Sequence, residues 1–170
     1  ELRVGDAIIA SEVVSAGECF PTHGRWSRDL ANRIPGAVLA PVAGSDTMTA
    51  DRDAKARLRA ATGASAVDME SHVAARVARS RGFPFAALRV VSDGAQRTLP
   101  PAARVAMRPS GGIDIAAVLG SLLRSPLQLP ALIRTAWEAE IAFAALFRCR
   151  YVLDPGFARA DFREFALDVG

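Results

Sequence analysis

Short apolar runs alternate with amphipathic stretches along the first half of the chain. The runs rich in β-branched residues have the length and composition of buried strands. They lie at residues 6–14, 36–44, 64–69 and 83–91. Apolar positions at helical spacing predict helices at residues 27–34, 50–62 and 70–81, and residues 17–26 are typical of a loop. This alternation of strands and helices predicts an α/β domain.

Residues 64–91 carry the strongest pattern, which is a strand, a helix and a second strand. Gly82 ends the predicted helix. The nearly continuous apolar run at 83–91 is typical of a strand buried on both faces of a sheet. The spacing predicts a βαβ unit, in which the two strands are adjacent and parallel and a right-handed crossover joins them.

Beyond Gly94 the pattern becomes helical. A short segment at 102–107 lies between two turn motifs, and helices are predicted at 113–124, before Pro126, and at 130–152. The tail at 154–170 is expected to dock as an irregular segment. The last helix combines a wide apolar face with several arginines, so we expect it to pack on the sheet, with peripheral membrane contact as the alternative.

Composition narrows the class of protein. The chain has 170 residues, of which 51% are hydrophobic, and a net charge of +3, which favours one globular domain. Lys55 is the only lysine, and acidic residues almost balance the arginines, so the basic pI does not favour nucleic acid. Cys19 and Cys149 lie far apart, so neither a disulfide framework nor a metal site is predicted. These features, with no apolar run of bilayer length, favour a cytoplasmic protein.

Two acidic residues follow the strands of the predicted βαβ unit. Glu70 comes directly after the first strand, and Asp93 comes after the second, so both are expected at one edge of the sheet. One carboxyl could deliver a proton to a leaving group, and the other could accept hydrogen bonds from ligand hydroxyls. The alternatives are a helix N-terminal acid at Glu70 and an ordinary turn residue at Asp93. Spacing alone leaves these assignments open.

The residues around these acids resemble the purine nucleoside phosphorylase and nucleosidase superfamily. Ala-Val-Asp-Met-Glu at 66–70 and the Phe-Pro-Phe strand that ends in Ser-Asp at 92–93 are similar to the methylthioadenosine/S-adenosylhomocysteine nucleosidase branch. The 23-residue step from Glu70 to Asp93 and the 21-residue step from Met48 to Met69 also agree. The resemblance covers residues 2–94, beginning with a Gly-Asp strand. It implies a three-layer α/β fold with a central mixed sheet.

Later motifs resemble a narrower group, the hopanoid-associated phosphorylases. These motifs lie at 97–103, 107–114, 128–134 and 165–169. The resemblance implies one nucleoside phosphorylase-like domain over 1–170, with a helical C-terminal segment at 97–170. It also implies release of adenine from adenosylhopane, an adenine nucleoside with an apolar 5′ substituent, in hopanoid biosynthesis. A methylthioadenosine/S-adenosylhomocysteine-type nucleosidase is the first alternative, and a noncatalytic nucleoside-binding or membrane-surface module is the second.

The superfamily resemblance also implies a role for each matching residue. Asp93 would protonate the departing purine at N7, and Ser92 would orient Asp93. Glu70 would accept hydrogen bonds from the ribose hydroxyls, Met69 would pack against the sugar, and Met48 would lie near the base. No cofactor is implied, although inorganic phosphate is a candidate co-substrate, and a homo-oligomer is expected.

The chain departs from the family pattern at several points. The N-terminal part of the family fold, which carries a Gly-rich loop and a further catalytic acid, is expected to be missing. Asp68 stands where the nucleosidase branch has Glu, and Thr47 replaces its stacking aromatic residue. Arg89 lies inside a predicted strand, so no arginine is assigned to phosphate. Phosphorolysis and hydrolysis therefore both stay open.

Overall fold

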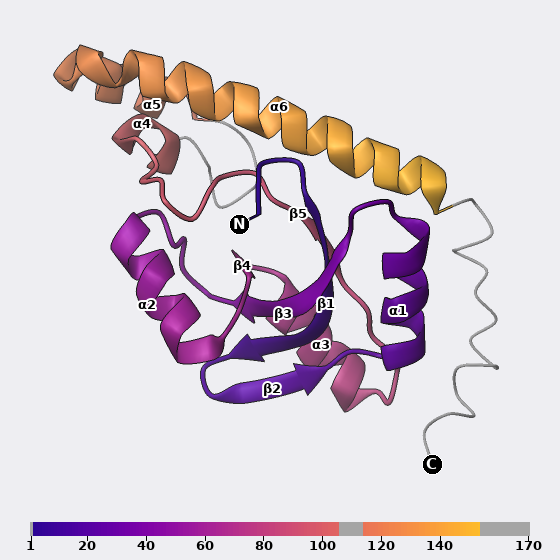
Figure 1. Ribbon diagram of the computed structural model, residues 1–170. Coiled ribbons are helices and arrows are strands. Elements are labelled where there is room, and N and C mark those ends of the chain that lie inside the picture. The colour runs from indigo at the N-terminus through magenta and orange to yellow at the C-terminus, as the bar shows by residue number, and fades with distance from the viewer. Residues whose placement is uncertain (1, 106–113, 154–170) are drawn as a thin grey trace.

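A five-stranded mixed sheet forms the centre of the computed structural model, which describes residues 2–105 and 114–153 (Figure 1). The strands are β1 (Ala7–Ser15), β2 (Glu18–Pro21), β3 (Val38–Gly44), β4 (Ala66–Asp68) and β5 (Leu88–Val90). Along one edge of β1 runs β3, in parallel, and β4 continues the sheet parallel to β3. Along the other edge, β2 and β5 both pair with β1 in the antiparallel direction. The expected α/β fold with a mixed sheet is therefore confirmed.

The helices begin and end where local sequence signals place them. They are α1 (Gly24–Arg33), α2 (Arg52–Thr62), α3 (Ser71–Ser80), α4 (Pro101–Arg104), α5 (Ile115–Arg124) and α6 (Leu129–Val152), with a 3₁₀ turn, η1 (Pro126–Gln128), before α6. The side chain of Asp51 accepts a hydrogen bond from the first turn of α2, and Gly63 ends that helix at a φ of 69°. A left-handed residue closes a helix readily when it is glycine.

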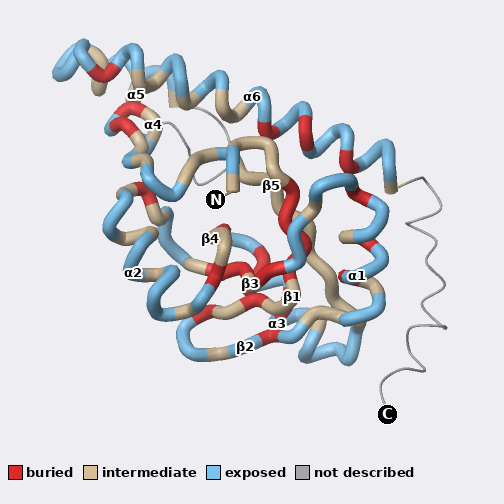
Figure 2. The backbone as a smooth tube through the Cα atoms, in the orientation of Figure 1, coloured by how far each residue is buried: buried red, intermediate tan, exposed pale blue. Residues whose placement is uncertain are grey.

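Three layers arise because the two faces of β1 are both buried. One face contributes Ile8, Ala10 and Val13 to a core that also includes Ala75 of α3. A bulge between Ala10 and Val13 puts these three side chains on the same face despite their uneven spacing. The other face packs against α1 and α6. Figure 2 shows the buried residues concentrated along β1 and β3, between the helices.

The predicted parallel pairing of the strands around α3 is wrong. β4 pairs with β3, whereas β5 pairs with β1 in the antiparallel direction, so the two strands are not neighbours. The segment before β5 runs along β1, and its Ala87 O accepts a hydrogen bond from Ala10 N at 2.9 Å. A continuous apolar run identifies a strand but does not specify which strand it pairs with. Here β5 pairs with the free edge of β1.

The strand predicted at 83–91 is also shorter and less buried than expected. The structure assigns only Leu88–Val90 to β5, all three residues are half-buried, and Phe83 is 63% exposed. β2 was not predicted, because a loop was expected at 17–26, and α1 begins at Gly24 rather than residue 27. The tail at 154–170 and the end of the segment at 102–107 lie outside the described residues.

The last helix passes over the sheet near β5 (Figure 1). It contacts β1 and β5 through a narrow strip of small residues. Its buried residues are Ala142, Ala145 and Cys149, while Trp137 is 71% exposed. The predicted packing on the sheet is thus confirmed for this strip. Within the described ranges no helix alone has the length and apolarity of a membrane span, although α5 and the segment Pro126–Val152, bent by 116°, meet that criterion together.

Candidate active site

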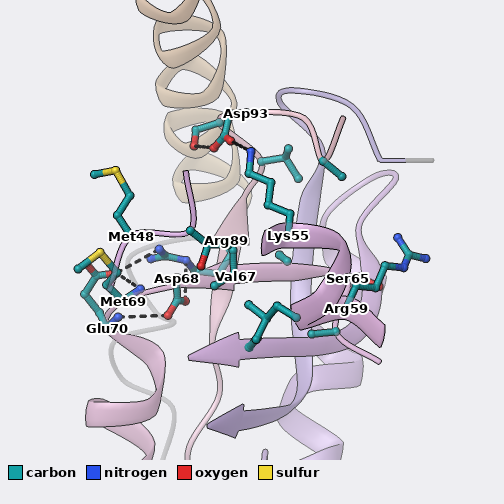
Figure 3. A pocket seen from close by; sticks show the side chains of 18 of the residues that line it. Met48, Lys55, Arg59, Ser65, Val67, Asp68, Met69, Glu70, Arg89 and Asp93 are labelled. Carbon is teal, nitrogen blue, oxygen red and sulfur yellow. Dashed lines mark hydrogen bonds and ion pairs between the residues drawn. The ribbon is translucent and has the colours of Figure 1, made fainter. Parts of the chain in front are cut away.

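A cavity of about 350 Å³ opens beside the carboxyl ends of β3 and β4, a volume in the range of small-molecule sites. Its walls come from α2, from the loop after β3, from β4 and the residues that lead into α3, and from β5 with the segment that follows (Figure 3). All five residues singled out from the sequence line it: Met48, Met69, Glu70, Ser92 and Asp93. Glu70 and Asp93 therefore line the same cavity even though the strands before them are not adjacent. Their chemical roles stay predictions.

Burial gives the two carboxylates next to α3 different surroundings. The side chain of Asp68 is fully buried and caps the helix, since Oδ1 accepts from Glu70 N at 3.1 Å and from Ser71 N at 2.8 Å. Ser71 Oγ donates to the other oxygen, Oδ2. The side chain of Glu70 makes no cap hydrogen bond and is 72% exposed. Glu70 thus stands at the N-terminus of α3, as the helix-terminal alternative expected, but the side-chain cap comes from Asp68, and Glu70 also lines the cavity.

Arg89 joins these two carboxylates. Its Nε lies 2.8 Å from Asp68 Oδ2, and its Nη2 lies 3.1 Å from Glu70 Oε2. The residue lies inside β5, as expected, but its guanidinium reaches across the cavity wall toward α3 (Figure 3). A guanidinium presents several donors in one plane, so a single Arg can hold both carboxylates in fixed directions.

Asp93 lies at the far end of the cavity lining from Glu70 in the view of Figure 3. Its side chain is 27% exposed and forms an ion pair with Lys55 through Oδ2. Ser92 Oγ donates to Oδ1 at 3.3 Å, which is the contact that an orienting role for Ser92 requires. Asp93 therefore lines the cavity and also pairs with a nearly buried cation, and its role stays a prediction.

The loop that carries Met48 is fixed to the start of α3. Ser45 N donates to Asp68 O at 2.8 Å, and His72 Nε2 lies 2.9 Å from Asp46 Oδ1. The imidazole of His72 is buried, with only 1% of its side chain exposed. His72 is thus a buried histidine, and its contact with Asp46 holds the loop. Met48 and Met69 remain exposed on the cavity surface.

The sequence interpretation assigned none of the three cations that line this cavity, which are Lys55, Arg59 and Arg89. Lys55 was recognised only as the single lysine of the chain, and Arg89 was set aside because it lies in a strand. The available signals were a lone charged residue in an apolar strand and a lone lysine in an arginine-rich chain. Neither signal indicates which carboxylate the cation contacts. Within 2–105 and 114–153, no three His, Cys, Asp or Glu side chains are placed to hold a metal ion.

The arrangement offers two carboxylates to different parts of one ligand. An exposed carboxylate can accept hydrogen bonds from hydroxyl groups, and a carboxyl at the other end can exchange a proton with a nitrogen base. A mixed α/β sheet with such a cavity at the carboxyl ends of its parallel strands is typical of a small-molecule site. The fold and the cavity thus define an α/β protein that has a candidate small-molecule site.

Comparison with known proteins gives the family. Residues 1–124 match the phosphorylase superfamily, and the chain belongs to that superfamily. It is 38% identical over 69 residues to the 5′-methylthioadenosine/S-adenosylhomocysteine nucleosidase of Treponema pallidum. These residues make up 41% of this chain and 26% of that protein. The chain therefore spans about a quarter of the length of that curated relative.

Solved structures share the fold. A putative methylthioadenosine nucleosidase from Weissella paramesenteroides aligns with a TM-score of 0.51 and 22% identity, over 82% of this chain and 63% of that one. The Campylobacter jejuni 5′-methylthioadenosine/S-adenosylhomocysteine nucleosidase aligns with a TM-score of 0.51 and 19% identity, over 83% and 62%. At this level of identity the alignments support the fold alone.

Proposed function

We propose that the protein cleaves the N-glycosidic bond of an adenine nucleoside. The observation that carries this proposal is the shared cavity, which Asp93 and Glu70 both line, at opposite sides in the view of Figure 3. Superfamily membership and the nucleosidase relative support the same reaction class. Asp93 would act on the base, and Glu70, held by Arg89, would accept hydrogen bonds from the ribose hydroxyls.

This division of roles follows from the charge that develops in the reaction. As the C–N bond breaks, its electron pair moves onto the base, and the ribose gains oxocarbenium character. A proton given by the Asp93 carboxyl neutralises the base, and the Glu70 carboxylate lies on the sugar side, where positive charge develops. Water or inorganic phosphate then attacks the anomeric carbon of the ribose. Hydrolysis and phosphorolysis would therefore use the same two acids.

The substrate that we propose is adenosylhopane, with methylthioadenosine or S-adenosylhomocysteine as the alternative. The proposal rests on the C-terminal motifs and on the apolar part of the cavity wall, which includes Met48, Leu58, Val91 and Leu99. An apolar 5′ substituent would gain from contact with such a surface, whereas the polar amino-acid end of S-adenosylhomocysteine would not.

Adenine release from each nucleoside, measured with the full-length protein by chromatography, tests the reaction and its substrate together. Asp93→Asn should lower the rate by roughly 10²- to 10⁴-fold, because general acid catalysis is lost. Glu70→Gln should also lower the rate. The exposed carboxylate of Asp29, on α1 and outside the cavity, provides the matched control, and Asp29→Asn should keep the wild-type rate.

The assay is run with and without inorganic phosphate. Formation of a ribose 1-phosphate product only with phosphate present would assign phosphorolysis, and equal release without phosphate would assign hydrolysis. Absence of adenine release from all three nucleosides would reject the proposed function. An Asp93→Asn variant that keeps full activity would reject the role of this residue.

A further inference from the structure

The ammonium group of Lys55 is enclosed by three oxygen acceptors. Lys55 extends from α2 and forms an ion pair with Asp93 Oδ2. Its Nζ also donates to Gly94 O and to Arg97 O, both at 3.1 Å. Only 10% of the side chain is exposed, so solvent contributes little to its hydrogen bonding. One cation therefore contacts both the carboxylate of Asp93, as Figure 3 shows, and the two ends of the turn that follows it.

The number and direction of these acceptors suit a lysine rather than an arginine. An ammonium carries three N–H donors arranged around one nitrogen, and the three acceptors here converge on that single atom. A guanidinium is larger, and its N–H donors lie in one plane and point outward from three nitrogens. It would therefore not donate to three oxygens that surround a single point. The site would have to open to admit it.

The composition of the chain makes this choice of cation informative. Of the 21 Lys and Arg residues, Lys55 is the only lysine. Every exposed cationic position of α2, such as Arg52 and Arg57, carries arginine. The single position that departs from this usage is the one whose cation is nearly buried against the proposed acid.

We propose that Lys55 is a positioning residue for Asp93, an inference that rests on the proposed function. Lys55 holds Oδ2 and the turn at 94–97, which leaves Oδ1, beside Ser92, as the oxygen that faces the departing base. In the ion pair Asp93 is a carboxylate, so it first takes up a proton from water on Oδ1. When it passes that proton to the base nitrogen, it becomes a carboxylate again next to an ammonium that keeps its own protons. The attraction between these charges strengthens as the proton leaves, so Lys55 stabilises the transition state more than the bound substrate.

Kinetics of Lys55 variants of the full-length protein test this inference. Lys55→Met should lower kcat by on the order of 10²-fold, as expected when a reacting group is misplaced, with little change in KM. Lys55→Arg should fail to restore kcat, although it keeps the charge. Arg57→Met removes an exposed cation from the same helix and should retain the wild-type kcat.

Chemical rescue separates positioning from a purely structural role. In Lys55→Ala, added methylammonium should restore part of kcat in a saturable way, because a small ammonium can occupy the space of the lost group. Neutral acetamide of similar size should not restore it. A thermal melt of each variant shows that the protein is folded, and wild-type kcat in Lys55→Arg or in Lys55→Met would overturn the inference.

A second measurement does not depend on activity. In protein labelled with ¹⁵N-lysine, the signal absent from Lys55→Arg identifies the Lys55 ammonium. Asp93→Asn should shift this signal and speed its hydrogen exchange with water, whereas Asp29→Asn should leave it unchanged. No effect of Asp93→Asn would overturn the pairing. If wild-type protein releases no adenine but the signal responds to Asp93→Asn, the proposed function fails while the Lys55–Asp93 pairing stands.

Discussion

Two carboxylates separated by one residue show how the surroundings of a side chain decide its task. Asp68 is buried and receives hydrogen bonds from Ser71 and Arg89, so its carboxylate belongs to the structure of the helix start. Glu70 is exposed, and its Oε2 accepts from Arg89 Nη2 and from the backbone N–H of Met69. Because Asp68 satisfies the donors of the helix N-terminus, the carboxylate beside it can face the cavity.

At the residue scale, Cys19 gives a prediction that depends on pH. Cys19 Sγ donates to Glu12 Oε2 at 2.8 Å, and this hydrogen bond to a carboxylate raises the pKa of the Cys19 thiol above its ordinary value. The protonated thiol is therefore favoured in the folded state, and that contribution to stability is lost as the pH rises through the folded pKa. Glu12→Gln should lower the pKa of Cys19 and speed its alkylation several-fold near pH 8.

Iodoacetamide labelling followed by mass spectrometry measures the alkylation rate of each cysteine. Cys149 is the internal control, since burial raises the pKa of its thiol and Glu12 does not contact it. Its labelling should stay slow in both proteins. Equal labelling rates for Cys19 in wild type and Glu12→Gln would contradict the proposed cause of the shift.

Individual residues also show what the sequence can and cannot predict about the site. Glu70 and Asp93 were predictable because each follows an apolar strand, and strand ends in α/β sheets carry ligand contacts. Lys55 and Arg89 were not predicted as site residues, since each reaches the cavity from an element whose placement depends on tertiary packing. The partner of a charged side chain is a property of the fold and not of its neighbours in sequence.

At the scale of elements, strand positions were more predictable than strand partners. β1, β3 and β4 lie within or almost within their predicted ranges, because apolar β-branched runs indicate burial in a sheet. The expected β4–β5 pair did not form, since the free edge of β1 accepts β5. β2 was missed because its four residues include Pro21 and a charged residue, which mask the apolar pattern.

The junction between β3 and α3 leaves no room for a side chain at Gly44. A Cβ atom there would lie 2.4 Å from the Cβ of His72 and 2.7 Å from its ring. Gly44→Ala should therefore destabilise the protein by about 1–3 kcal/mol, the usual cost of overpacking. Urea unfolding monitored by circular dichroism measures this change.

Gly24 provides the matched control for that substitution. It begins α1, and a Cβ atom there would meet nothing within 4 Å. Gly24→Ala should be neutral or slightly stabilising, because alanine lowers the entropy of the unfolded chain. Equal effects of the two substitutions would show that the contact with His72 does not limit this junction.

At the scale of the whole molecule, polar contacts supplement the narrow apolar strip that holds α6. Glu138 has only 13% of its side chain exposed, and it forms an ion pair with Arg97, in the segment after β5. Arg134, one turn earlier on α6, lies 3.1 Å from the same carboxylate. Since the carbonyl of Arg97 also accepts from Lys55, this contact connects the last helix to the segment that carries Asp93.

Glu138→Gln should therefore make local opening of α6 more frequent, while the amides of the sheet stay protected from hydrogen exchange. The substitution leaves two guanidinium groups without their carboxylate, and because Arg97 is partly exposed we expect a cost of about 1–2 kcal/mol rather than that of a fully buried pair. Hydrogen exchange followed by mass spectrometry should show faster exchange in α6 and unchanged exchange in β1. Glu140→Gln, an exposed change on the same helix, should alter neither element. If α6 exchanges equally in both variants, the apolar contacts of Ala142, Ala145 and Cys149 hold this helix without help from the ion pair.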